Sequence, residues 1–206
     1  MYVYKMLLFL EKMNVVSENY EHIGDFGNCE ILLYKNIRNS QKLHSAIIEG
    51  KIKCAMIKPA LIAHPLQIAV ATKKSLAAKY ASSSANTNSK TKGLMTKSVF
   101  TEILYNLAPT KNIAESLKLY GIGQEDTEIL IVITKEPGTE QDEVKNVLIN
   151  EIDGDLVPNL MDEIEGLPSL TNWELVSKVH KLKSTSLNKK NIVDILISRA
   201  ATKDVS

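Results

Sequence analysis

The sequence has few of the features that mark disulfide-rich, metal-binding or membrane proteins. Cysteine occurs only at Cys29 and Cys54 among 206 residues, which gives neither the close spacing of a metal-binding pair nor the number that a disulfide framework needs. The apolar run near the N-terminus covers only residues 6–10 and is too short for a signal-peptide core or a membrane span. We therefore expect a soluble protein of a reducing, intracellular setting, with no membrane partner.

Motifs for catalysis and cofactor binding are also missing. The glycine pair in 121–126 lies between a predicted helix and a predicted strand and ends in Asp126, so it does not form a dinucleotide-binding loop. The segment 153–164 begins like a calcium loop but has Pro158 where the obligatory glycine belongs. No nucleophile elbow or phosphate-loop lysine is present, and no metal-ligand spacing joins the four histidines, His22, His44, His64 and His180. We expect no enzyme, cofactor or metal site; an unrecognised active site is the alternative.

The chain length suits one domain with its own core. Alternation of apolar runs and helical periods predicts strands at 29–37, 53–59 and 127–134, and the last of these should be covered on both faces because residues 129–133 are all apolar. Helical spacing predicts helices at 40–50, 64–81, 95–108, 112–120, 142–152, 172–182 and 191–201. The expected fold class is α/β (α+β), a small mixed sheet packed with several helices and a helical C-terminus.

Two segments are expected to lie outside this framework. We expect residues 1–20 to form an extension before a domain at 21–206. Residues 82–93 are polar, rich in serine and asparagine and without apolar anchors, which is typical of a mobile loop.

The helix at 112–120 has well-marked ends. Pro109 should end the preceding helix, and Asn112 and Glu115 match an N-x-x-E form of the capping box. Gly121 stands where a left-handed residue would close the helix. No catalytic side-chain set accompanies this helix.

Charge is distributed unevenly along the chain although the net charge is only +1. Residues 73–111 have seven lysines against Glu102, residues 124–165 have thirteen acids against two lysines, and residues 178–190 have five lysines and no acid. This pattern predicts either a cationic face for phosphates or solvated charge on unrelated surfaces. We expect Glu102 to form a salt bridge with a nearby lysine rather than to be a buried acid.

The last predicted helix has an unusually wide apolar arc. At about 100° per residue, its apolar side chains extend over roughly 240°, interrupted only by Arg199, whereas an ordinary surface helix needs a stripe of about 100°. Either a partner covers the remaining apolar surface, or the helix is wedged in the interior of the domain.

Three segments, at 32–80, 95–122 and 199–205, together resemble the TPRKB (PRPK-binding protein) family, whose members are small non-catalytic subunits of the KEOPS/EKC complex. The specific elements are a P-x-Q helix start at Pro65 and Gln67, a T-K-S-x-x-x-E run at 96–102, and N-L-x-P-x-x-N-I followed by a helix ending in Gly-Ile at 106–122. The resemblance covers about residues 22–206. It implies a subunit that binds and stimulates a PRPK-type atypical kinase, contacts other subunits indirectly and helps recruit tRNA by its 3′ CCA end for threonylcarbamoyladenosine modification.

The resemblance also lets roles be assigned to residues. For kinase binding we expect the apolar arc of the last helix, represented by Val193, Leu196, Ile197 and Ala200. For tRNA binding we expect phosphate contacts from lysines, a helix-start cap and a stacking tyrosine, represented by Lys92, Lys97, Lys111, Asn112 and Tyr120. The expected localisation is the cytoplasm and nucleus. A stand-alone RNA-binding module that acts without the kinase is the alternative function.

Overall fold

A computed structural model describes residues 29–83, 93–134, 147–148, 150–157, 170–182 and 188–203. The expected extension at 1–20 lies outside these residues, as do most of the loop predicted at 82–93 and of the segment 142–152. No helix in the described part of the chain is long and apolar enough to cross a bilayer.

A four-stranded sheet forms the centre of the described structure. Its strands are β1 (Cys29–Lys35), β2 (Ala55–Ile57), β3 (Ile129–Thr134) and β4 (Asp155–Leu156), in the order β2-β3-β1-β4. All of these pairings are antiparallel, whereas we expected a mixed sheet. Each residue of β3 is buried, which confirms the prediction of a strand covered on both faces.

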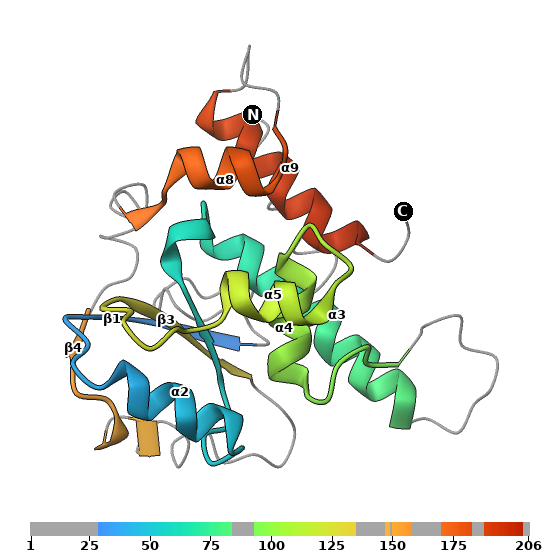
Figure 1. The fold of residues 1–206 in the computed structure, drawn as a ribbon. Coiled ribbons are helices and arrows are strands. Elements are labelled where there is room, and N and C mark those ends of the chain that lie inside the picture. The colour runs from blue at the N-terminus through green and yellow to red at the C-terminus, as the bar shows by residue number, and fades with distance from the viewer. Residues whose placement is uncertain are drawn as a thin grey trace.

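Helices cover both faces of the sheet and confirm a single α/β domain with a helical C-terminus (Figure 1). α2 lies on one face, where Leu148 and Ile152 also pack, while α3, α4, α5, α8 and α9 lie on the opposite face, with α8 and α9 outermost. The helices are α2 (Ser40–Ile48), the short 3₁₀ helix η1 (Pro59–Leu61), α3 (Pro65–Ser83), α4 (Val99–Leu107), α5 (Ile113–Tyr120), α8 (Trp173–Val179) and α9 (Lys189–Thr202).

The strands divide their side chains between two apolar cores because successive side chains point to opposite faces of a sheet. Ile31 and Leu33 of β1 join the larger core, which α3, α4, α5, α8 and α9 cover. Tyr34 joins the smaller core, in which Leu43 of α2 packs against β3. The two cores hold the sheet between its helical layers. This packing also fixes where the ends of the surrounding helices come together.

The start of α5 confirms its predicted cap and adds a partner to it. The side chain of Asn112 accepts a hydrogen bond from the Glu115 N–H at 3.1 Å. The Glu115 carboxylate does not return a bond to Asn112, as in the usual capping box. It accepts instead from the Thr110 hydroxyl at 2.8 Å, and the Thr110 oxygen accepts from the Asn112 N–H at 3.2 Å. Thr110 thus links the two predicted capping residues.

The end of α5 differs from the prediction. Gly121 follows the helix as expected, but its φ is −72° and the residue is extended rather than left-handed. Glycine is needed there because an added Cβ would lie 2.6 Å from the carbonyl oxygen of Leu117. By contrast Gly50, the predicted stop of the helix at 40–50, does have a positive φ of 71°.

Glu102 is a buried acid, so the expected lysine salt bridge is wrong. Its side chain is 2% exposed, and its carboxylate accepts hydrogen bonds from the Thr96 backbone N–H at 2.8 Å and the Thr96 hydroxyl at 2.7 Å. Within the described residues, these two hydrogen bonds stabilise the negative charge of the Glu102 carboxylate. They also attach the segment before α4 to the helix.

Helix α9 is packed against its own domain, mainly against α3 and also against α4. Leu196, Ile197 and Ala200 are at most 6% exposed, whereas Val193 is half-buried. The expectation that these apolar residues are left uncovered is therefore wrong for the first three, because α3 and α4 provide a second wall for the arc. Their role as kinase contacts stays a prediction, and Val193 is the member of the predicted set that reaches the surface.

Candidate nucleic-acid interface

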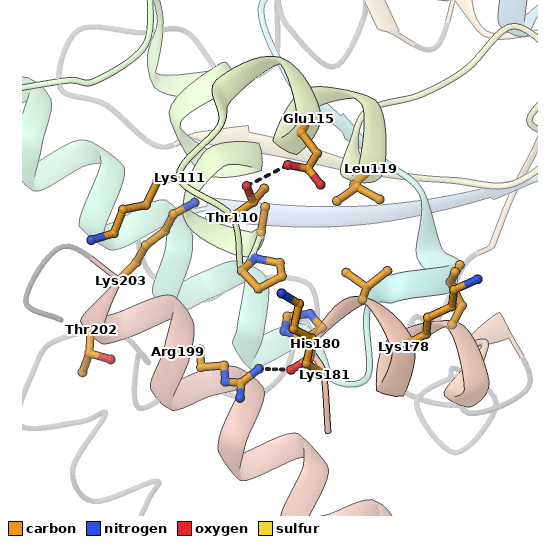
Figure 2. A pocket seen from close by; sticks show the side chains of 14 residues that line it. Thr110, Lys111, Glu115, Leu119, Lys178, His180, Lys181, Arg199, Thr202 and Lys203 are labelled. Atoms are coloured by element: carbon orange, nitrogen blue, oxygen red, sulfur yellow. Dashed lines mark hydrogen bonds between the residues drawn. The ribbon is translucent and has the colours of Figure 1, made fainter. Parts of the chain in front are cut away.

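A groove of about 870 Å³ lies where α5, α8, α9 and the connection between α4 and α5 come together. We call it the basic groove. Figure 2 shows how side chains from these elements, far apart in the sequence, surround one space. The residues that line it are Ala108, Pro109, Thr110, Lys111, Glu115, Leu119, Leu175, Lys178, Val179, His180, Lys181, Arg199, Thr202 and Lys203.

The lining is strongly cationic and partly apolar. It includes five cations, Lys111, Lys178, Lys181, Arg199 and Lys203, against one carboxylate, Glu115. Aliphatic side chains such as Leu119 and Val179 lie among them. A concave surface that combines clustered cations with aliphatic contacts suits a phosphate-bearing ligand with apolar parts.

The C-terminal end of α8 positions one of these cations, Lys181, at the groove. The Lys181 N–H donates to the Lys178 carbonyl at 3.2 Å, and the Leu182 N–H donates to the Ser177 carbonyl at 2.9 Å. These bonds form the Schellman motif, which requires a left-handed residue after the helix. Lys181 takes that position with a φ of 51°, where glycine is usual. The sequence thus places a lysine at the groove at some cost in backbone strain.

Arg199 of α9 and its C-cap residue Lys203 donate hydrogen bonds to carbonyl groups at the C-terminal ends of other helices. Arg199 donates to the carbonyl oxygen of His180, the C-cap residue of α8, at 2.5 Å. The Lys203 ammonium group donates to the carbonyl oxygen of Tyr105 in the last turn of α4 and lies 3.5 Å from the centre of the Tyr105 ring. Carbonyls at helix C-termini carry partial negative charge, so both contacts stabilise the docking of α9. Three exposed lysines, Lys111, Lys178 and Lys181, complete the cationic lining.

A buried polar pair lies beneath the groove. The Tyr120 hydroxyl and His180 Nε2 are 2.8 Å apart, and the two side chains are 0% and 2% exposed. Burial, and to a lesser extent the charge of Arg199, lower the pKa of His180 to about 4. Burial also raises the pKa of the Tyr120 hydroxyl. Both groups are therefore neutral near pH 7, and the prediction that Tyr120 stacks a base is wrong because no face of its ring is accessible.

The predicted tRNA-binding residues are only partly brought together. Lys111 lines the groove, and Asn112 is exposed beside it as the cap of α5. Lys97 is exposed but does not line the groove, and Lys92 lies outside the described residues.

Sequence reasoning missed the contribution of α8 and α9 to this site. The acid-free lysine segment at 178–190 was the available signal, because it includes Lys178 and Lys181. In the sequence, Arg199 stands out only as an interruption of an apolar arc. No group of three or more metal-ligating side chains occurs within the described residues.

Comparison with known proteins agrees with the resemblance. The sequence profile of the family described as "Kinase binding protein CGI-121" matches residues 34–204. The chain is 28% identical over 177 residues to the "EKC/KEOPS complex subunit TPRKB" of Danio rerio, covering 85% of this chain and 90% of that protein. It is 26% identical over 164 residues to the "EKC/KEOPS complex subunit cgi121" of Aspergillus fumigatus, covering 78% and 80%.

A more distant relative also matches over most of its length. The "EKC/KEOPS complex subunit CGI121" of Cryptococcus neoformans is 22% identical over an alignment of length 222, which covers 88% of this chain and 95% of that protein. The family profile spans the described sheet from Tyr34 onward and all the described helices. The chain belongs to the CGI-121 family of kinase binding proteins.

Proposed function

We propose that this protein is a non-catalytic subunit of a KEOPS/EKC complex that binds and stimulates a PRPK-type atypical kinase and helps recruit tRNA for threonylcarbamoyladenosine modification. Family membership supports the kinase and complex partners, since the matching profile is described as a kinase binding protein and the relatives are named as complex subunits. The basic groove supports the tRNA partner.

For kinase binding we propose the outward edge of α9 around Val193. Leu196, Ile197 and Ala200 hold the helix on α3 and α4, and this packing fixes the position of the half-buried Val193. A rigid helix with an apolar edge is a suitable docking surface for another protein.

Val193→Glu tests this contact against Ser198→Glu, which introduces the same charge at an exposed position of α9. Both variants are co-expressed with the kinase and separated by size-exclusion chromatography. We expect Val193→Glu to lose co-elution and Ser198→Glu to keep it. Unchanged co-elution of Val193→Glu would place the kinase contact elsewhere.

For tRNA binding the single observation that supports the proposal is that Lys111, Lys178 and Lys181 line one groove together with aliphatic side chains. Lysines neutralise phosphates and release their counterions, which provides affinity without reading sequence. The single-stranded 3′ CCA end is flexible enough to enter a concave site, whereas a duplex is not.

The double variant Lys178→Glu/Lys181→Glu tests the groove, with exposed Lys53→Glu outside the groove as the matched control. Affinity for fluorescent tRNA should fall at least tenfold in the double variant and stay within about twofold in the control. Trimming the CCA end from the tRNA should have a similar effect on the unsubstituted chain. If tRNA binds but the kinase does not co-elute, the alternative of a stand-alone RNA-binding module is favoured.

A further inference from the structure

Two lysines of the basic groove depend for their positions on the end of a short helix. α8 has only seven residues, Trp173–Val179, and a helix of that length is not stable without tertiary support. Lys178 lies in its last turn, and Lys181 follows it in the left-handed conformation. The two ammonium groups therefore lie in a defined place only if other elements hold this end of α8.

His180 lies between these lysines and attaches the helix end to both neighbouring helices. Its N–H donates to the Val176 carbonyl within α8 at 2.9 Å. Its carbonyl oxygen accepts from Arg199 of α9 at 2.5 Å (Figure 2). Its ring nitrogen Nε2 is 2.8 Å from the hydroxyl of Tyr120, the last residue of α5.

Tyr120 is itself fixed on the sheet. Its carbonyl oxygen accepts the N–H of Lys58, directly after β2, at 2.8 Å. The tyrosine side chain is 0% exposed and does not line the groove. A buried polar pair lowers stability unless its hydrogen bond is made, so the Tyr120–His180 bond favours one position of the end of α8 over others.

We propose that Tyr120 is a positioning residue of the basic groove, which acts through His180 to hold Lys178 and Lys181 where they receive phosphates. The inference rests on the proposed RNA-binding function of the groove. A lysine that is held in place before its ligand arrives loses less conformational entropy when the ligand binds. Loss of the Tyr120 hydroxyl should therefore weaken RNA binding without changing the number of phosphate contacts.

The test compares Tyr120→Phe, which removes only the hydroxyl, with the unsubstituted full chain. Fluorescence anisotropy with labelled tRNA over a range of salt concentrations gives both the affinity and its salt slope. The affinity should fall about threefold to tenfold, and the slope should stay unchanged because the same lysines still neutralise phosphates in the complex. Loss of a direct phosphate contact would lower the slope, and a purely structural role would lower the unfolding temperature alone.

Variants of His180 test whether Tyr120 acts through it. His180→Gln places a terminal amide near the position of Nε2 and should keep the affinity within about twofold. His180→Leu should lose as much affinity as Tyr120→Phe. The double variant Tyr120→Phe/His180→Leu should lose no more than either single variant, because all three break the same hydrogen bond.

Tyr34→Phe is the matched control, since Tyr34 is a buried tyrosine of the smaller core on the opposite face of the sheet. It should keep the affinity of the unsubstituted protein, and all binding is measured below the unfolding temperature of each variant. An unchanged affinity in Tyr120→Phe, a lower salt slope, additive losses in the double variant, or an equal loss in Tyr34→Phe would overturn the inference. Failure of the unsubstituted protein to bind tRNA would instead reject the proposed RNA-binding function of the groove.

Discussion

Two residues next to the basic groove, His180 and Lys181, are held in states that lower the stability of the fold. His180 is buried in neutral form with Tyr120, and Lys181 has a left-handed backbone conformation. Each costs stability that an ordinary surface residue would not. Both residues belong to the C-terminal end of α8, which Arg199 closes, so local strain and the cationic site coincide.

The buried His180 predicts acid sensitivity. Its pKa is about 4 in the folded protein, whereas in the unfolded chain it protonates near 6.5. Between these values the unfolded state binds more protons, so the free energy of unfolding should fall as the pH drops from about 6.5 to 4 and should be unaffected by this group above 6.5. The loss should amount to roughly 2–3 kcal/mol, measured by urea denaturation at several pH values.

His180→Gln is the control for this effect. Glutamine can keep a hydrogen bond to the Tyr120 hydroxyl through its terminal amide, but it does not titrate. The variant should lose most of the pH dependence in this window even if it is less stable at pH 7. An identical slope in both proteins would assign the acid sensitivity to other groups.

The backbone of Lys181 predicts an unusual order of stability among two variants. Both Lys181→Gly and Lys181→Ala remove the charge and should weaken RNA binding equally. Glycine adopts a positive φ without a steric cost, so Lys181→Gly should be more stable than Lys181→Ala by about 1 kcal/mol. Chemical denaturation measures the difference, and a more stable alanine variant would show that the φ of 51° is not maintained in solution.

Among the helices and strands, α9 depends most on its tertiary partners. Its apolar face packs on α3 and α4, and Arg199 and Lys203 close the ends of α8 and α4. Removing part of that face should therefore destabilise the whole domain.

Leu196→Ala should cost about 2–5 kcal/mol because Leu196 is only 1% exposed and its removal leaves a cavity. Val193→Ala should cost about 1 kcal/mol or less, since Val193 is half-buried. Urea denaturation of both variants checks this order. Similar small costs for both would mean that α9 is more loosely attached than its packing indicates.

The elements that could be predicted from sequence are those whose signals are local. The apolar run of β3, the asparagine cap of α5 and the helical period of α9 are each contained within one short stretch of the sequence. β4 could not be predicted in this way, because two exposed residues, Asp155 and Leu156, become a strand only by pairing with the end of β1.

The groove was only partly predictable for the same reason. Lys111 could be selected from the sequence beside the capped helix, but Lys178 and Lys181, which line the same groove, follow about seventy residues later. The burial of Tyr120 depends on its partner His180, sixty residues away. A wide apolar arc is equally compatible with a core helix and an interface, and only the positions of α3 and α4 decide between them for α9.

At the scale of the molecule, positive charge is concentrated at the basic groove although the net charge of the chain is small. The chain is only +1 overall, but three exposed lysines meet at the groove while Lys42 pairs with Glu151 on a different surface. RNA binding should therefore reflect a local field rather than general attraction to a basic protein.

The salt dependence of tRNA binding tests this local field. If Lys111, Lys178 and Lys181 each neutralise one phosphate of a single strand, the logarithm of the affinity should fall with the logarithm of salt concentration with a slope of about −2. Removing two of the lysines should reduce the slope to about −0.7, whereas Lys53→Glu should leave it near −2. Fluorescence anisotropy over a range of salt concentrations measures these slopes, and a slope near zero would exclude phosphate contacts as the source of affinity.

The position of α9 in the chain has a consequence for synthesis on the ribosome. Of the described elements it is translated last, yet it covers α3 and α4 and closes two helix ends. Before it emerges, the nascent domain exposes an apolar surface and incomplete helix termini, which are features that chaperones recognise. A premature stop codon before residue 189 should therefore yield a product that is degraded, rather than a shortened subunit that competes for the partners of the intact one.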